Sequence, residues 1–302
     1  MDLPALDRLD VAGRRVLVRC DLNTPVAQVG GRLEVVDDFR IRATVPLLIE
    51  LFARGASVVA CTHFGRPKGR VVAQYSVEPV RRRLDDLCPG VDLMENLRFS
   101  PGEEANDPGF GALLVDGVDL YVNEAFGSSH RAHASIMVPP TLRPSAAGPN
   151  LVREVGALSR LLESPRRPFV AVVGGAKVAD KLGVMRSLVE LADTVVVGGG
   201  MAYTFLAAQG HTVGASLFDA QRVAECAELL ATGRVLVPID GRGLASGEAF
   251  GRDGGPGAVI DFGRDVPDGV VGLDIGLASA DAFALAHAEA RSILWNGPMG
   301  VF

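Results

Sequence analysis

Residues 169–183 read FVAVVGGAKVADKLG, and the rest of the chain is interpreted outward from this stretch. It opens with a short apolar run rich in Val, which is typical of a buried parallel strand. Gly174 and Gly175 follow at once, and they let the backbone approach a ligand at the N-terminus of the next helix. Lys177 and Lys181 are four residues apart, so on a helix they would share one face. We therefore predict a phosphate site with two positive charges and several free N–H groups; an ordinary turn with solvated lysines is the alternative.

The composition limits the class of protein. The chain has 302 residues, of which 48% are hydrophobic and 22% charged, as expected for a soluble globular protein with two domains. A net charge of −6 argues against nucleic-acid binding. The four cysteines form no C-x-x-C pair, so we expect neither a disulfide framework nor a zinc site, and a reducing cytoplasm fits best. We expect no signal peptide, and glycines interrupt the uncharged residues 194–218, so no membrane span is predicted.

Basic and polar residues follow the predicted strands of the first half. The residues that follow strands predicted over 15–20, 57–61, 92–94 and 119–122, or that begin the helix predicted over 39–54, are Asp21, Leu22, Asn23, Arg40, His63, Phe64, Gly65, Arg66, Arg98 and Arg131. Carboxyl ends of parallel strands meet at one edge of a sheet, so these side chains are expected to lie close together. Guanidinium groups match carboxylate and phosphate oxygens, so we predict a site for a small polyanion. Solvated loop arginines are the alternative.

The second half of the chain repeats one pattern of strand, glycines and helix. A proline-rich run over 139–149 predicts a domain boundary, and the apolar spacing that follows predicts a connecting helix to about Ser164. Strands predicted over 194–197, 272–275 and 292–295 are followed, respectively, by Gly198, Gly199 and Gly200, by Gly276, and by Asn296, Gly297 and Pro298. This alternation predicts a parallel doubly wound sheet with a nucleotide-sized crevice. Within 241–268 only a strand near 258–262 is predicted.

Several familiar motifs are missing from the sequence. It contains no G-x-x-x-x-G-K-[ST], no G-x-G-x-x-G after a strand, no G-x-S-x-G and no H-E-x-x-H. The interpretations of this chain as a typical P-loop enzyme or as an NAD-dependent oxidoreductase therefore lose their main support. What remains is a polyanion site in one half and a glycine-rich phosphate site in the other. That combination predicts phosphoryl transfer across a cleft.

Seven segments, in their order along the chain, resemble those of phosphoglycerate kinases: RVLVRCDLNTP, HFGRPKG, ENLRFSPGEE, EAFGSSHRAHAS, GGAKVADKLG, GGGMAYTF and WNGPMGVF. The resemblance implies an α/β fold with two Rossmann-like parallel-sheet domains, joined by a helix and facing each other across a hinge cleft. Residues 1–149 would bind phosphoglycerate, 150–164 would form the linker helix, and 165–302 would bind the nucleotide.

The same resemblance implies a reaction and its residues. The reaction is reversible phosphoryl transfer between ATP and the carboxylate of 3-phosphoglycerate, giving 1,3-bisphosphoglycerate and ADP, with magnesium. The strand-end residues named above would bind phosphoglycerate, with Arg40 at the transferring group and Lys177 following that group as it moves. The implied nucleotide site comprises Gly174, Gly175, Lys177, Lys181, Gly198, Gly199, Gly200, Asn296, Gly297 and Pro298. The implied protein is a cytoplasmic monomer, and no metal ligand is assigned.

The sequence departs from the family pattern at several places. Family members continue past the equivalent of Phe302 with, among other parts, the loop that binds magnesium with the nucleotide. Residues 88–91 replace a usual strand and helix, residues 240–243 (DGRG) replace a valine-rich strand, and Glu124 replaces a usual aspartate. We therefore expect weak nucleotide binding. The alternative is a non-catalytic paralogue that binds phosphoglycerate but not the magnesium nucleotide.

Overall fold

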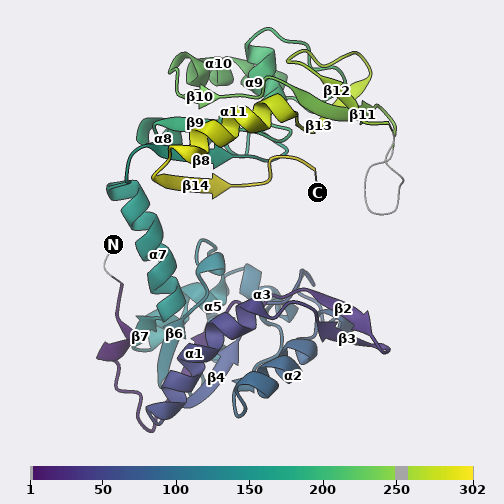
Figure 1. Ribbon diagram of the computed structural model, residues 1–302. Coiled ribbons are helices and arrows are strands. Elements are labelled where there is room, and N and C mark those ends of the chain that lie inside the picture. Colours follow the sequence, from purple (N-terminus) through teal and green to yellow (C-terminus); the bar gives the residue numbers. More distant parts are fainter. Residues whose placement is uncertain (1–2, 249–257, 302) are drawn as a thin grey trace. The chain divides into compact units, whose positions relative to one another are not determined.

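The computed structural model describes residues 3–248 and 258–301; Phe302, which ends the last segment quoted above, lies outside them. The chain divides into two compact units, Met1–Ser159 and Arg160–Phe302, each of which is described by itself (Figure 1). Each unit contains a parallel sheet with helices packed on both faces. The predicted α/β class is confirmed.

The first unit is built on a five-stranded sheet in the order β5-β4-β1-β6-β7, with every neighbouring pair parallel. The strands are β1 (Arg15–Arg19), β4 (Ser57–Cys61), β5 (Asp92–Leu93), β6 (Leu120–Asn123) and β7 (Ser145–Ala147). An antiparallel hairpin of β2 (Val26–Val29) and β3 (Arg32–Val35) turns at Gly30 and Gly31, both with positive φ.

Helices cover both faces of this sheet because side chains alternate along each strand. In β1, Val16 and Val18 pack in one core cluster with α1 and α2, whereas Leu17 packs on the opposite face with α4. The helices of the unit are α1 (Phe39–Ala53), α2 (Glu78–Leu87), α3 (Pro101–Glu104), α4 (Pro108–Leu114), α5 (Ala134–Met137) and α6 (Pro139–Leu142). The strand β1, with its buried residues Val16, Leu17 and Val18, therefore lies at the centre of the unit.

The proline-rich run over 139–149, which the sequence predicts to be a domain boundary, contains regular secondary structure. It contains α6 and the strand β7, and β7 pairs with β6 at the edge of the sheet. Pro144 donates no hydrogen bond, yet its carbonyl accepts one from Tyr121 N at 3.1 Å. An edge strand needs backbone pairing on one side only, so proline is tolerated beside it. The predicted connecting helix is α7 (Pro149–Glu163), and the division between the units falls within it.

The second unit has a four-stranded parallel sheet in the order β10-β9-β8-β14. Its strands are β8 (Phe169–Val173), β9 (Thr194–Val197), β10 (Val235–Leu236) and β14 (Ser292–Asn296). The helices α8 (Leu182–Leu191), α9 (Ala202–Ala208) and α10 (Val223–Ala231) pack on one face, and α11 (Leu277–Ala288) packs on the other. No helix in the described ranges is long and apolar enough to cross a membrane.

The strand predicted over 272–275 does not belong to this parallel sheet. It is part of β13 (Val270–Ile275), which pairs antiparallel with β11 (Gly241–Ala245) in a separate sheet of order β12-β11-β13. The predicted strand near 258–262 is β12 (Ile260–Phe262). Glycine is depleted in strands, so β11 gave no sequence signal. Its glycine is required here, since a Cβ on Gly243 would lie 2.2 Å from the Val271 carbonyl oxygen.

Candidate functional site

A pocket of about 260 Å³ lies at the carboxyl edge of the first sheet, where the segments after β1, β4 and β6 meet. Its lining consists of Asp21, Asn23, Arg40, His63, Gly65, Arg66, Arg98, Gly127, Ser128 and Arg131. The structure thus brings together most of the predicted strand-end residues. Leu22 and Phe64 are buried beside them and do not line the pocket. Gly127 and Ser128, from the 3-10 helix η4 (Phe126–Ser128), were not predicted.

The pocket has an excess of positive charge. Its four arginines face a single lining carboxylate, that of Asp21, which accepts a hydrogen bond from Arg40 Nη1. Arg98 is only 6% exposed, and it donates from Nη1 to the Gly65 carbonyl at 2.8 Å while its Nε lies 3.0 Å from Glu104 Oε1. Arg40 and Arg98 thus each pair with a carboxylate, and Arg66 and Arg131 add two further positive charges to the lining. A partly enclosed surface with more guanidinium groups than carboxylates attracts a small anion.

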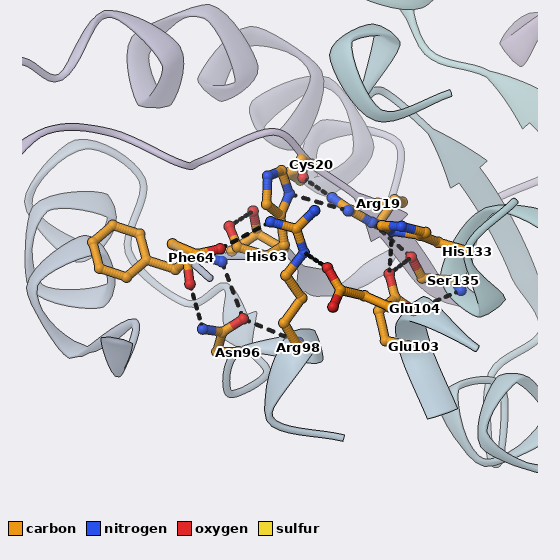
Figure 2. A network of polar contacts seen from close by, with 12 residues as sticks. Arg19, Cys20, His63, Phe64, Asn96, Arg98, Glu103, Glu104, His133 and Ser135 are labelled. Carbon is orange, nitrogen blue, oxygen red and sulfur yellow. Dashed lines mark hydrogen bonds and ion pairs between the residues drawn. The ribbon is translucent and has the colours of Figure 1, made fainter. Parts of the chain in front are cut away.

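A buried amide holds two of the pocket's loops together. Asn96 donates from Nδ2 to the Phe64 carbonyl at 2.7 Å, and its Oδ1 accepts from Phe64 N at 3.0 Å and from Arg98 N at 3.1 Å (Figure 2). One side chain therefore fixes both the loop after β4, which carries His63, and the loop after β5, which carries Arg98. Fixed loops lower the entropy that a ligand would otherwise have to remove on binding.

A second buried network contacts the pocket residue His63 (Figure 2). Arg19, at the end of β1, is 0% exposed and donates from Nε to Ser135 Oγ at 2.9 Å and from Nη1 to the Cys20 carbonyl. Its Nη2 lies 3.3 Å from His63 Nδ1. Ser135 in turn donates from Oγ to Glu103 Oε1 at 2.6 Å and from N to Oε2 at 2.9 Å. The buried guanidinium is thereby linked to a buried carboxylate.

Sequence reasoning missed Arg19, Glu103 and Ser135. One signal was available: Arg19 follows the apolar residues 16–18 within β1, and a guanidinium is almost never buried in a strand without partners. The partners themselves carried no signal, because Ser135 lies 116 residues further along the chain.

The environment of His63 keeps its imidazole neutral. Burial, followed by the positive charges of Arg19 and Arg98, lowers the pKa of His63 from 6.5 to about 2. His133 differs, since its Nδ1 lies 3.7 Å from Glu103 Oε1 and this carboxylate opposes the lowering of its pKa by burial. The two histidines thus have partners of opposite charge.

In the second unit three glycine-rich loops pack against one another through their backbones. Gly174 N donates to the Asn296 carbonyl at 2.9 Å, and Gly199 N donates to the Met299 carbonyl at 2.7 Å. A Cβ on Gly174 would lie 2.0 Å from the Pro298 carbonyl oxygen, and one on Gly297, whose φ is +92°, would lie 2.1 Å from the Gly174 carbonyl oxygen. Only glycine allows this approach of the loops after β8, β9 and β14.

Two details of the predicted phosphate site are wrong. The helix after Gly175 begins only at Leu182, so Lys177 and Lys181 precede α8 and do not share a helical face. Of the N–H groups predicted to be free within residues 169–183, that of Gly174 donates to the Asn296 carbonyl. The N–H groups of Gly198 and Gly199, in the next glycine loop, also donate to carbonyls. The sequence suggested a strand followed directly by a helix, but loop-to-loop packing uses these groups.

The remaining predicted residues lie around these loops. Lys181 Nζ hydrogen-bonds to Asn296 Oδ1, which joins the loop after β8 to the loop after β14. Lys177, four residues before Lys181, is exposed. Gly200 lies close to Ala176, because a Cβ added to Gly200 would be 2.9 Å from the Ala176 carbonyl oxygen. The other predicted residues of these loops are Gly175, Gly198 and Pro298. The structure brings the predicted residues of all three loops together.

Two Rossmann-like units, one with a basic pocket at its strand ends and the other with interlocked glycine loops, define an α/β phosphotransferase class of protein. The family model for phosphoglycerate kinase matches residues 6–93 and 89–302. This chain belongs to the phosphoglycerate kinase family.

Named relatives agree with this assignment. The phosphoglycerate kinase of Frankia casuarinae is 42% identical over 331 residues, covering 98% of this chain and 82% of the relative. That of Rubrobacter xylanophilus is 42% identical over 327 residues, covering 100% of this chain and 81% of the relative. The solved phosphoglycerate kinase of Coxiella burnetii has a TM-score of 0.81 and 30% identity, covering 100% of this chain and 81% of that structure.

The comparisons also show that this chain is shorter than its relatives. The alignment with the Frankia relative spans 331 residues, more than the 302 of this chain, so it includes positions that this chain lacks. The two segments that match the family model meet at residues 89–93. In the structure these residues comprise most of the short connection after α2, which ends at Leu87, and the strand β5 (Asp92–Leu93).

Proposed function

We propose that the chain catalyses reversible transfer of a phosphoryl group between ATP and the carboxylate of 3-phosphoglycerate, which gives 1,3-bisphosphoglycerate and ADP. The observation that carries this proposal is the pocket of the first unit, where four arginines lie with His63. 3-Phosphoglycerate has a phosphate and a carboxylate, and guanidinium groups bind both through paired hydrogen bonds. Membership of the phosphoglycerate kinase family supports the same substrate.

The proposed roles follow from position and charge. The phosphoglycerate site consists of Asp21, Leu22, Asn23, Arg40, His63, Phe64, Gly65, Arg66, Arg98 and Arg131. Arg40 acts on the transferring group, and its half-exposed guanidinium, paired only with Asp21 in the described contacts, supports that role. Side chains perform little covalent chemistry in phosphoryl transfer, so catalysis rests on positioning and charge neutralisation.

The glycine loops of the second unit are the proposed nucleotide site. Gly174, Gly175, Gly198, Gly199, Gly200, Gly297 and Pro298 would bring backbone close to the nucleotide, and Lys177, Lys181 and Asn296 would contact its phosphates. The exposure of Lys177 supports its role of following the transferring phosphoryl group. A lysine provides a point charge on a flexible stem, which suits a group that must move with its ligand.

Magnesium belongs to the reaction of the family, and when bound with a nucleotide it neutralises phosphate charge. Within residues 3–248 and 258–301, no group of three or more His, Cys, Asp or Glu side chains is arranged to hold a metal ion. These residues form no ready site for the ion, so no step is assigned to it. That the family's metal-binding loop is absent stays a prediction.

We further propose a cytoplasmic monomer that binds 3-phosphoglycerate and adenine nucleotide, and neither nucleic acid nor membrane. The net charge of −6 supports the exclusion of nucleic acid. Residues 1–149 would bind phosphoglycerate, 150–164 would link the domains and 165–302 would bind nucleotide. The non-catalytic alternative gains no support from the comparisons.

A coupled assay with ATP, magnesium and 3-phosphoglycerate tests the function. We expect turnover by the wild-type chain and none by a variant that carries both Arg40→Ala and Lys177→Ala. The matched control is Arg160→Ala, which removes an exposed cation from α7 and leaves both sites intact. A wild-type rate no higher than that of the double variant would remove the enzymatic claim.

A further inference from the structure

Arg19 is a buried cation that the proposed reaction does not use directly. It is fully buried, it does not line the pocket, and it touches one residue that does, His63. A buried charge costs several kcal/mol unless its hydrogen bonds are satisfied, so its partners are part of its role. The nearest counter-charge is Glu103, also 0% exposed, which Arg19 reaches through Ser135.

In the hydrogen bond between Arg19 and His63, only Arg19 can be the donor. A guanidinium donates hydrogen bonds and accepts none. The nitrogen 3.3 Å from Arg19 Nη2, which is His63 Nδ1, must therefore be the acceptor and carry no proton. In a neutral imidazole the proton is then on Nε2. His63 lines the pocket, so its N–H donor is available to a ligand there.

We propose that Arg19, held in place by Ser135 and Glu103, is a positioning residue that fixes His63 as a neutral imidazole with its proton on Nε2. His63 then always presents a hydrogen-bond donor to an oxygen of the anion in the pocket. The identity of that anion as 3-phosphoglycerate rests on the proposed function. The tautomer itself does not, because it follows from the contacts of the protein without ligand.

The charges around His63 all act in the same sense. Among these charges, Arg19 and Arg98 lower the pKa of His63 most, and His133 and Arg131 lower it further. Tyr121 closes the network from β6 by donating from its hydroxyl to the Ser135 carbonyl at 2.8 Å. A second proton on His63 would add a positive charge to this group of cations, so the neutral ring is the form that they stabilise.

Nitrogen-15 NMR of the histidine rings tests the inference on the full chain without ligand. The protein has five histidines, and a His63→Gln variant assigns the ring in question. In the wild type we expect Nδ1 to resonate as an unprotonated nitrogen and Nε2 as a protonated one, unchanged between about pH 5 and 8. A protonated Nδ1, or titration of His63 in this range, would overturn the proposal.

Variants then test whether Arg19 is responsible. Arg19→Gln replaces an obligate donor by an amide that can also accept, so we expect both His63 nitrogens to shift toward a mixture of tautomers. Arg19→Lys restores an obligate donor and should move the signals back toward those of the wild type. The control is Arg143→Gln, since Arg143 donates to the carbonyls of Val118 and Val115. Unchanged His63 signals in folded Arg19→Gln protein would contradict the role.

Ligand binding provides the second readout. Calorimetry with 3-phosphoglycerate should show a Kd about tenfold higher in Arg19→Gln and within about twofold of wild type in Arg143→Gln. If Arg19→Gln does not fold, Ser135→Ala keeps the guanidinium but removes its link to Glu103, and it should raise Kd about threefold. Equal affinities in wild type and folded variants would refute the positioning role. Failure of the wild type to bind 3-phosphoglycerate would instead refute the proposed function, with the tautomer still decided by NMR.

Discussion

The two sites of this protein are built from different parts of the polypeptide. The pocket of the first unit is made of charged side chains, and buried side chains such as Arg19 and Asn96 hold those in position. The site of the second unit is made of backbone, because its glycine loops touch through N–H and carbonyl groups. Substitutions in the first site should therefore change binding separately from folding, whereas in the second site the two should change together.

The largest effect should come from adding one methyl group to the second site. In Gly174→Ala the new Cβ would collide with the backbone oxygen of Pro298, which no rotamer change can relieve. We expect the free energy of unfolding to fall by about 3 kcal/mol, with loss of ADP binding. Urea unfolding followed by fluorescence reports on this unit, since the sole tryptophan, Trp295, lies in β14.

The matched control for this substitution is Gly183→Ala in the same segment. Gly183 lies in α8 and has no atom within 4 Å of an added Cβ. Alanine favours a helix over glycine, so stability should rise by about 0.5–1 kcal/mol. Equal effects of the two substitutions would contradict the view that backbone packing builds this site.

The second prediction concerns pH, because the first unit contains buried ionisable groups. Burial raises the pKa of Glu124 from 4.5 to about 7, although Asn150 donates to its carboxylate from N at 3.0 Å and from Nδ2 at 2.6 Å. The folded protein thus keeps a proton that the unfolded chain loses. This contribution to stability is complete below about pH 4.5 and is lost as the pH rises through about 7, with a magnitude of about 3 kcal/mol.

The measurement is the difference in unfolding free energy between wild type and Glu124→Gln across this pH range, followed by circular dichroism. Glutamine has no titrating group, so the difference should change between about pH 4.5 and 7 and be flat elsewhere. A difference that does not depend on pH would show that folding leaves the pKa of Glu124 unchanged. The same comparison with Gly183→Ala should be flat at every pH, because neither residue titrates.

The third prediction separates binding from folding in the first site. Arg40 is half-exposed and pairs with Asp21, so Arg40→Gln should cost at most about 1 kcal/mol of stability. It removes a charge-assisted contact to the anion, so the Kd for 3-phosphoglycerate should rise about tenfold or more. Calorimetry and urea unfolding on the same samples check both numbers. A decrease in the free energy of unfolding as large as the decrease in binding free energy would contradict the proposed difference between the two sites.

The smallest effect is expected for Lys181, a charged side chain that connects two of the glycine loops. Lys181 Nζ contacts Asn296, but the loops are also held by backbone hydrogen bonds. Lys181→Met should therefore lower stability by about 0.5–1 kcal/mol and raise the Kd for ADP severalfold. Fluorescence unfolding and nucleotide titration measure these quantities. A loss equal to that of Gly174→Ala would mean that the side chain, and not the backbone, holds the loops.

Much of the first site could be predicted from the sequence, but the buried residues that hold its side chains in place could not. Polar residues after apolar strands identify the pocket because parallel strands present their carboxyl ends at one edge, as His63 and Arg98 do. The strands β7 and β11 could not be predicted, because β7 follows Pro144 and β11 contains two glycines, and both residue types normally disfavour strands. The start of α8 was placed too early because the glycines appeared to lead directly into a helix.

The sequence by itself determined the family, the α/β class and the residues that gather at the strand ends, because these follow from local apolar runs and from motifs read in order. Only the tertiary structure decided which N–H groups of the glycine loops are used, and which partners hold Arg19 and Lys181. Lys181 and Asn296 are 115 residues apart, and Arg19 and Ser135 are 116 apart. Contacts between such distant residues depend on how the strands are ordered in each sheet, and no local pattern in the chain encodes that order.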